Sequence, residues 1–243
     1  MFDHVGIHVS DRAASEAFYA KVLAPLSIEK TYSGADFVEW DDFALGQTDD
    51  AHPVTRRLHV GFVAPSRAEV DEFWRVGTEA GYRDDGPPGE RPQYAEDYYG
   101  AFLLDPDGNS VEAVHGSWVG PPGNVDHLWF RVADVAAAKR FYEVVAPHAG
   151  FRLRTDTAQR ASFWRRGGSF SVVAGDAPTE HLHIAFGVSE DAAVEAFHRA
   201  ALAAGYRDNG APGERPEHHP GYYAAFVLDP DGNNVELVNH HRD

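Results

Sequence analysis

An internal repeat constrains this chain more than any other feature of its sequence. The octapeptide DPDGNSVE begins at residue 105, and DPDGNNVE begins at residue 229, an offset of 124. The run GERP recurs with the same offset, at residues 89 and 213, and the pair Phe-Tyr recurs at residues 18 and 141, an offset of 123. Solenoid units repeat every ~20 to 50 residues. The longer repeat found here therefore predicts two whole domains in tandem.

Composition suggests where the two copies meet. Residues 117–124 are rich in Gly and Pro and show no periodicity, which is typical of a linker. We therefore predict a first domain over residues 1–116 and a second over residues 125–243. Each has about 120 residues, enough to bury a core of its own.

Charge and residue usage exclude several classes of function. The 38 acidic residues exceed the 21 Lys and Arg residues, and a net charge of −17 would repel nucleic acid and anionic membranes. The chain has no Cys, so any metal must be held by nitrogen and oxygen. The start MFDHVGIHVSD lacks the basic segment and apolar stretch of a secretory signal, and no apolar run reaches the ~18 residues of a membrane span. We expect a cytoplasmic protein.

Periodicity predicts the same order of elements several times. Residues 4–10 alternate with period two, so their apolar side chains share one face of a strand while His4 and His8 share the other. A helical pattern follows and ends before Pro25, and short runs between residues 31 and 47 predict an antiparallel meander. Together these elements make one βαβββ module.

The order recurs over the rest of the chain. In the first copy we expect a strand at 58–63, a helix after Ser66, a loop at 85–96, and strands at 99–104 and 110–114 joined by a turn at the DPDG sequence. In the second copy we expect strands at 126–132, 181–187, 222–228 and 234–239, helices at 134–145 and 190–204, a meander at 151–173 and a loop at 208–220. The predicted fold class is α+β, with four βαβββ modules paired into two tandem domains.

Histidine and glutamate side chains occupy matching strand positions in both copies. Each lies opposite the apolar face of its strand, and the six are His4, His59 and Glu112 in the first copy and His127, His183 and Glu236 in the second. Two imidazoles and one carboxylate form a facial set that leaves positions open on Fe(II), and the set also suits Mn, Zn or Ni. Fourteen histidines occur, so one strand histidine alone is weak evidence, but retention of all six positions favours a divalent metal in at least one copy.

The grouping of these ligands has two alternatives. A tandem chain can pair neighbouring modules directly, which predicts that each set of three assembles within its own copy. Exchange of modules between the domains would instead join His4 to His183 and Glu236. We predict the first arrangement, and the distances between the side chains decide between them.

These residues and elements resemble the vicinal oxygen chelate superfamily, which includes glyoxalase I, bleomycin- and fosfomycin-resistance proteins, methylmalonyl-CoA epimerase and type I extradiol dioxygenases. The resemblance rests on the βαβββ repeat, the strand histidines and the DPDG-x-x-x-Glu sequence, and it covers nearly the whole chain twice. It implies paired modules whose sheet curves around a metal, with the six residues above as ligands. The metal would chelate neighbouring oxygens of a small-molecule substrate.

The sequence departs from members of this superfamily at two places. Glyoxalase I and the epimerase carry a further ligand late in the meander, where this chain has residues 43–45 and 169–173 without an acid. Extradiol dioxygenases place a His and then a Tyr before the DPDG turn, where this chain has Phe102 or Phe226 at the tyrosine position and a histidine, His218 or His219, in the second copy only. The first departure argues against isomerase activity, and the second makes the oxygenase match partial.

Several further residues are candidates for contact with a substrate. His8 and Arg131 share the predicted metal-facing side of their strands, and Arg131 would favour an anionic group. His219 is a third candidate and has no counterpart in the first copy. The tyrosine pairs at 98–99 and 222–223 are equally consistent with a pocket wall and with core packing. The DPDG sequences themselves are interpreted as turns, because Pro restricts φ and Gly accepts a positive φ.

The leading prediction is a divalent-metal-dependent enzyme, of dioxygenase or lyase and isomerase type, acting on a small molecule with neighbouring oxygens. The alternative is a metal-free sequestering protein that resembles bleomycin-resistance proteins, and the two complete ligand sets favour the enzyme. A third hypothesis makes one copy catalytic and the other structural. The expected partner is a small molecule, with no nucleic acid and no membrane, and a homodimer is left open.

Overall fold

The structure is a computed structural model that describes residues 1–117 and 123–241. Residues 118–122 of the predicted linker lie outside the described residues. The chain divides into two compact units. We call residues 6–129 the N-unit, and residues 1–5 together with 130–243 the C-unit. The domain bounds inferred from the repeat stay a prediction, because compactness and duplication need not divide a chain at the same residue.

The described residues contain four α-helices and one 3-10 turn, which follows α1: α1 (Arg12–Leu23), η1 (Ala24–Leu26), α2 (Arg67–Glu79), α3 (Val135–Ala149) and α4 (Asp191–Ala203). None of these helices is long and apolar enough to cross a membrane. The strands of the N-terminal half are β1 (His4–Val9), β2 (Tyr32–Ser33), β3 (Phe37–Glu39), β4 (Phe43–Gln47), β5 (Leu58–Val63), β6 (Arg83–Glu90), β7 (Tyr99–Leu104) and β8 (Ser110–His115). Those of the C-terminal half are β9 (Val125–Val132), β10 (Arg152–Asp156), β11 (Arg160–Arg165), β12 (Gly168–Ala174), β13 (His183–Gly187), β14 (Arg207–Glu214), β15 (Tyr223–Leu228) and β16 (Asn234–Asn239). The order βαβββ thus occurs four times, which confirms the predicted fold class.

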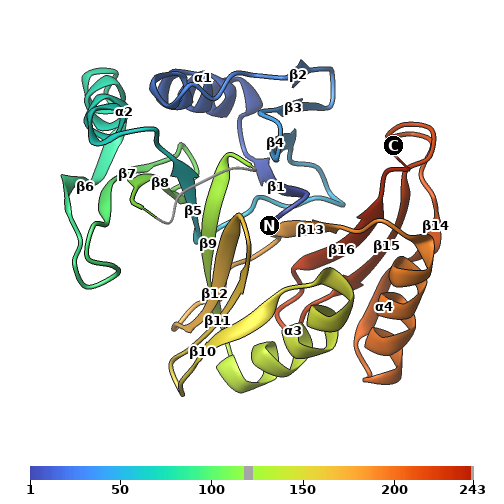
Figure 1. The fold of residues 1–243 in the computed structure, drawn as a ribbon. Coiled ribbons are helices and arrows are strands. Elements are labelled where there is room, and N and C mark those ends of the chain that lie inside the picture. Colours follow the sequence, from blue (N-terminus) through green and yellow to red (C-terminus); the bar gives the residue numbers. More distant parts are fainter. Residues whose placement is uncertain (118–122, 242–243) are drawn as a thin grey trace. The chain divides into compact units, whose positions relative to one another are not determined.

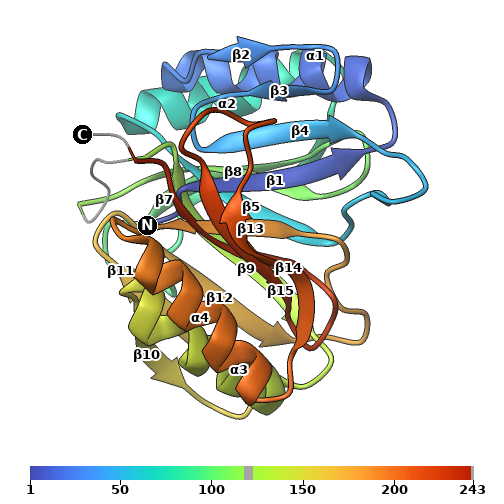
Figure 2. The same cartoon turned by 90° about the vertical axis from the view of Figure 1, so that its right-hand side faces the viewer.

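In the C-unit, strands β14, β15, β16 and β13 pair in that order, and the first residues of β1 follow β13. β13 and β16 run parallel, whereas β15 and β16 run antiparallel. Helix α4 covers β14, β15 and β16, as Figure 1 shows. Strands β10, β11 and β12 form an antiparallel meander next to the end of β9, and α3 packs on β11 and β12 beside α4 (Figure 2).

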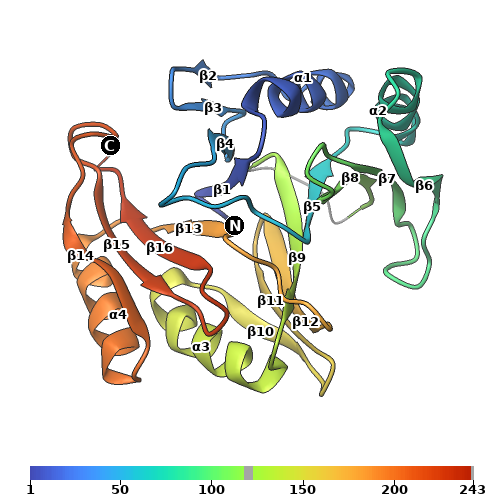
Figure 3. The same cartoon turned by 180° about the vertical axis from the view of Figure 1, so that it is seen from behind.

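The N-unit has the same plan. Strands β6, β7, β8 and β5 pair in that order and continue to the first residues of β9, while β2, β3 and β4 pair beside the later residues of β1. Helix α2 packs on β6, β7 and β8, as Figure 3 shows, and α1 packs on β4 and α2. Strands β1 and β9 therefore each contribute residues to both units.

Local sequence explains where the helices begin and what they bury. Asp11 and Asp134 precede α1 and α3, and each carboxylate accepts a hydrogen bond from a backbone N–H of the first turn. The buried face of α1 includes Phe18 and Tyr19, whose rings meet edge to face at 4.9 Å. The same pair recurs in α3 as Phe141 and Tyr142, so both units bury an edge-to-face Phe-Tyr pair.

Two predicted loops are strands over their first halves. β6 and β14 occupy residues that were expected to be loop because of their Gly and Pro content, so that prediction was wrong. Both are edge strands, where Pro is tolerated because one row of N–H groups needs no partner. Register shifts between Asp84 and Gly86, and again between Gly86 and Gly89, absorb the irregular residues as bulges.

The DPDG turns join β7 to β8 and β15 to β16. Gly108 has φ of +86°, as predicted for its place in the turn. The buried Asp105 accepts a hydrogen bond from the backbone N–H of Asn109, and the Asn109 side chain bonds the backbone of Thr55 and Leu58. The turn before β8 is thereby tied to the start of β5. Asp229 and Asn233 make the equivalent bonds in the second copy.

Candidate metal centres

Two clusters of histidine and glutamate lie on the strands, one in each unit. We call them the His59 centre, made of His59, Glu112 and His127, and the His4 centre, made of His4, His183 and Glu236. The His59 centre draws its residues from β5, β8 and β9 within the N-unit, and the His4 centre from β1, β13 and β16 within the C-unit. All six predicted ligand positions are therefore brought into one of two clusters.

This grouping corrects the prediction that ligands assemble within a copy. His4 lies 3.0 Å from His183, between their Nε2 atoms, and His59 lies 3.2 Å from His127. The physical reason is strand pairing: the first residues of β1 continue the sheet beside β13, and the first residues of β9 continue the sheet beside β5. The leading strand of each copy therefore contributes its histidine to the centre built on the other copy.

The atoms of the His59 centre converge closely. The Nε2 atom of His59 lies 2.9 Å from Oε2 of Glu112, and the Nε2 atom of His127 lies 3.2 Å from the same oxygen. Glu112 is buried, with 1% of its side chain exposed, whereas His59 is 22% exposed. The carboxylate is thus the more deeply buried of these two ligands, and His59 lies closer to solvent.

The His4 centre has the same plan with wider spacing. Oε2 of Glu236 lies 3.0 Å from Nε2 of His183 and 3.6 Å from Nε2 of His4. Glu236 is also 1% exposed, while His4 is 24% exposed. Both centres therefore place one buried anion beside two imidazoles; both imidazoles are partly accessible in the His4 centre, whereas His127 is buried in the His59 centre.

These donor sets fit a single divalent cation. Ligand–metal bonds of about 2.1 Å that meet at angles between about 90° and 110° place donor atoms about 3.0 to 3.4 Å apart. The separations in the two centres lie close to this interval, with the His4–Glu236 distance of 3.6 Å the widest. Two neutral nitrogens and one carboxylate suit Fe, Mn, Zn or Ni, and three donors leave other positions of the ion open.

Carboxylates orient the histidines that come from β1 and β9. Nδ1 of His127 lies 2.8 Å from Asp126, and Nδ1 of His4 lies 2.9 Å from Asp3. A carboxylate only accepts, so Nδ1 must carry the hydrogen, which leaves the lone pair of a neutral ring on Nε2, facing the centre. When neutral, each of these imidazoles therefore presents Nε2 to a metal.

Tyrosine hydroxyls orient the glutamates. Tyr98 donates to Oε1 of Glu112 at 2.5 Å, and Tyr222 donates to Oε1 of Glu236 at 2.6 Å. The second oxygen, Oε2, is the one that faces the histidines in each centre. The sequence prediction left these tyrosines undecided between pocket and core, and it did not assign Asp3 or Asp126. Their repetition beside matching ligands was the signal that could have identified them.

The charge states of the two centres differ. Burial alone would raise the pKa of Glu112, but hydrogen bonds from His127 and His59 outweigh it and lower the pKa to about 2. Burial alone would lower the pKa of His127, but hydrogen bonds to Asp126 and Glu112 raise it to about 10. In the His4 centre, burial lowers the pKa of His183, and Glu236 offsets only part of this effect. Without metal, the His59 centre therefore holds an ion pair that includes a protonated His127.

This ion pair predicts a pH dependence of stability. Because the folded pKa of His127 lies above its ordinary value of 6.5, its contribution is complete below pH 6.5 and is lost as the pH rises towards about 10. We expect the Tm of chelator-treated protein to fall by roughly 5 °C more than that of His127→Asn between pH 7 and 10. Differential scanning calorimetry measures both. Parallel declines in the two proteins would contradict the assigned ion pair.

The three predicted substrate contacts have different surroundings. His8 stacks on His52, with ring centroids 4.8 Å apart, and the stem of Arg131 lies over Gly175. Each stands four residues from the ligating histidine of its own strand, a spacing of roughly 13 Å at the rise of a β-strand. Neither is therefore brought into a centre, and their role in substrate contact stays a prediction.

His219 is connected to the His4 centre through two other side chains. Its Nε2 lies 2.8 Å from Nδ1 of His240, and Nε2 of His240 lies 3.0 Å from the carboxylate of Asp3. Asp3 in turn holds His4. His219 thus stands at the outer end of a hydrogen-bonded series that ends at a ligand.

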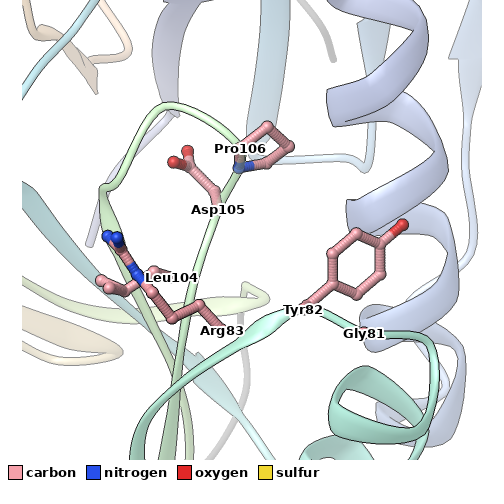
Figure 4. A pocket seen from close by; sticks show the side chains of 6 residues that line it. All are labelled: Gly81, Tyr82, Arg83, Leu104, Asp105 and Pro106. Atoms are coloured by element: carbon pink, nitrogen blue, oxygen red, sulfur yellow. The ribbon is translucent and has the colours of Figure 1, made fainter.

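A separate pocket lies away from the ligand sets. It has a volume of about 240 Å³ and is lined by Gly81, Tyr82, Arg83, Leu104, Asp105 and Pro106 (Figure 4). None of the six ligand residues lines it. The pocket adjoins the DPDG turn, whose role is structural, so we do not assign it to the candidate site.

Comparison with known proteins agrees with this architecture. No curated protein matches the chain. Among solved structures, glyoxalase I from Zea mays is similar with a TM-score of 0.67 and 19% identity, over 98% of this chain and 92% of that chain. A Bacillus subtilis protein described provisionally as a dioxygenase is similar with a TM-score of 0.65 and 12% identity, over 99% of this chain and 85% of that chain. At these identities the likeness shows the fold alone.

The family assignment rests on the sequence itself. The model of the Glyoxalase/Bleomycin resistance protein/Dioxygenase superfamily matches residues 1–113 and again residues 124–237. The two matches together span most of the chain and coincide with the duplication. The fourfold βαβββ order and the two ligand clusters agree with both matches. The chain therefore belongs to the Glyoxalase/Bleomycin resistance protein/Dioxygenase superfamily.

Proposed function

We propose that this protein is a divalent-metal-dependent enzyme whose substrate is a small molecule with two neighbouring oxygen atoms. The observation that carries the proposal is the three-donor geometry of each centre, with a buried glutamate next to two histidines, at least one of which is partly exposed. A structural zinc site usually closes its shell with four protein ligands, whereas three ligands leave room for substrate. Two open sets of this kind favour chemistry over a purely structural role.

The residues of each centre would have distinct roles. The histidines and the glutamate hold the ion, and Asp3 or Asp126 keeps one histidine of each centre in the tautomer that presents Nε2. A bound divalent ion would act as a Lewis acid toward two adjacent substrate oxygens. The hydroxyls of Tyr98 and Tyr222 hold the glutamates in place, so that the carboxylates need not reorient when substrate binds.

Aromatic side chains border both centres. The ring of Phe102 lies 5.9 Å from that of His59, and the ring of Phe226 lies 6.4 Å from that of His183. Arg91 and Arg215 stack over these two phenylalanines. A planar substrate with oxygen atoms at one edge would match an apolar wall of this kind and bring negative charge near the arginines. The proposal includes both ring-opening oxygenation and lyase or isomerase chemistry.

The test begins with protein purified without chelators and analysed for metal content. The apoprotein is then reconstituted anaerobically with Fe(II), Mn(II), Zn(II) or Ni(II) and presented with catechols and α-hydroxycarbonyl compounds. We expect turnover of at least one compound only after metal is restored, and uptake of O₂ identifies the oxygenase type. Tight binding of a panel compound by apoprotein, with no turnover under any metal, would support the sequestering alternative instead.

A further inference from the structure

We infer that the two centres are not equivalent, and that the His59 centre binds a divalent cation about 10- to 100-fold more tightly than the His4 centre. The inference rests on the proposed function only in requiring that such a cation binds. The evidence for it is the set of side chains that contact the Nδ1 side of the ligating histidines. These side chains differ between the two copies, although the ligands themselves are the same.

The first difference lies behind His59 and its counterpart His183. Nδ1 of His59 lies 3.0 Å from the hydroxyl of Ser110, and that hydroxyl donates to Asp85 at 2.7 Å. Because the carboxylate only accepts, the hydroxyl must accept from Nδ1–H. The hydrogen on Nδ1 of His59 is therefore fixed, and Nε2 is the atom that faces the centre.

The equivalent series behind His183 has no carboxylate. Nδ1 of His183 lies 2.7 Å from the side-chain nitrogen of Asn234, and Asn209 donates to the oxygen of Asn234 at 3.0 Å. An amide nitrogen donates, so the neutral ring of His183 carries its hydrogen on Nε2, the atom that a metal needs. Metal binding at His183 requires both amides to turn over, whereas Nδ1 of His59 already donates and its partners can keep their orientation.

The second difference concerns the aspartate next to each leading-strand histidine. Asp126 bonds Nδ1 of His127. Asp3 bonds His4, but its carboxylate also accepts a hydrogen bond from His240. The residue of the first copy that corresponds to His240 is Gly116, which has no side chain to donate. The charge of Asp3 is therefore shared between two imidazoles.

The third difference is the space available to the leading-strand histidine. The ring of His127 lies directly over Gly61, where an added Cβ would come within 2.3 Å of it, and the His127 side chain is only 8% exposed. The second copy has Ala185 at the position of Gly61, and His4 is 24% exposed. The donors are also more widely spaced in the His4 centre, at up to 3.6 Å.

All three differences favour tighter metal binding at the His59 centre. Carboxylates behind the histidines raise the basicity of the ligands, and removal of such partners typically costs 10- to 100-fold in metal affinity. Preorganisation adds to the affinity, because metal binding at the His59 centre needs no amide to turn over.

The experiment isolates each centre in the full-length chain. Glu236→Gln leaves the His59 centre, and Glu112→Gln leaves the His4 centre. Isothermal titration of each apoprotein with Mn²⁺ at pH 8, supported by the absorption spectrum with Co²⁺, gives a Kd for each centre. We expect the Kd to be about 10- to 100-fold lower in Glu236→Gln.

A reciprocal exchange then tests the cause. In the Glu236→Gln background, Asp85→Asn with Ser110→Asn should raise the Kd about 10-fold. In the Glu112→Gln background, Asn209→Asp with Asn234→Ser should lower it by a similar factor. The control is Asp50→Asn, which removes one negative charge, as Asp85→Asn does, but at an exposed position of the N-unit. It should leave the Kd unchanged.

The outcomes separate this inference from the proposed function. Equal affinities in the two single-centre variants, or a lower Kd in Glu112→Gln, would overturn the inference while the metal-dependent function stands. If the two Kd values differ but the reciprocal exchange leaves both unchanged, the cause assigned here would be refuted. Absence of binding in the wild-type chain and in both variants would instead remove the proposed function itself.

Discussion

Replacement of both Glu112 and Glu236 by Gln is expected to remove metal binding and to lower metal-dependent turnover by at least about 1000-fold. Each glutamate is the carboxylate donor of its centre, with Oε2 between 2.9 and 3.6 Å from the two imidazoles. Gln has nearly the same shape but no charge, and its side-chain oxygen can still accept from Tyr98 or Tyr222. The fold should therefore persist while the anionic ligand is lost.

Metal analysis after dialysis against Mn²⁺, turnover of the compound found by the reconstitution screen, and circular dichroism together measure this result. The matched control is Glu96→Gln with Glu217→Gln, which makes the same change of charge at exposed positions. The control should keep its metal and its turnover. Full turnover by a metal-free Glu112→Gln and Glu236→Gln protein would end the metal-dependent account and promote the sequestering alternative.

The second large effect tests which histidine belongs to which centre. In a Glu112→Gln background, in which the His4 centre is intact, we expect His4→Ala to remove the remaining ion, with a loss of affinity of at least about 100-fold. His59→Ala in the same background should leave that ion bound. The reason is that His4 lies 3.0 Å from His183, whereas His59 belongs to the cluster with Glu112 and His127.

The reverse background provides the control. With Glu236→Gln, His127→Ala should remove the ion, and His183→Ala should not. Equilibrium dialysis with Mn²⁺ gives the number of ions per chain in each variant. If His127→Ala rather than His4→Ala emptied the chain that carries Glu112→Gln, the ligands would be grouped within each copy.

Local patterns predicted the modules and the ligands because those features depend on neighbouring residues. The alternation around His4 and around His59 decides which face of a strand carries the imidazole, and the DPDG sequence predicts a turn from the preferences of Pro and Gly. The structure confirms both the order of the elements and the turn at Gly108. The Gly- and Pro-rich edge strands were missed because their bulges interrupt the alternation on which such predictions depend.

The pairing of the centres could not be predicted in this way. Strands β1 and β9 carry equivalent sequences, so nothing near His4 or His127 indicates which neighbour each strand takes. That choice depends on contacts between residues far apart in the chain, such as the hydrogen bond from the backbone N–H of Asp3 to the carbonyl of Ala185 at 2.9 Å. The side chains that support the ligands, including Asp85 and Asn209, could not be predicted for the same reason.

The proposed function places a divalent cation at each set of histidines and glutamate. The most direct measurement is an anomalous difference map from crystals grown with Co²⁺, recorded on both sides of the cobalt absorption edge. The account predicts two peaks, one bounded by His59, Glu112 and His127 and the other by His4, His183 and Glu236. Occupied cobalt sites elsewhere in the chain, with no peak at either set of ligands, would contradict it.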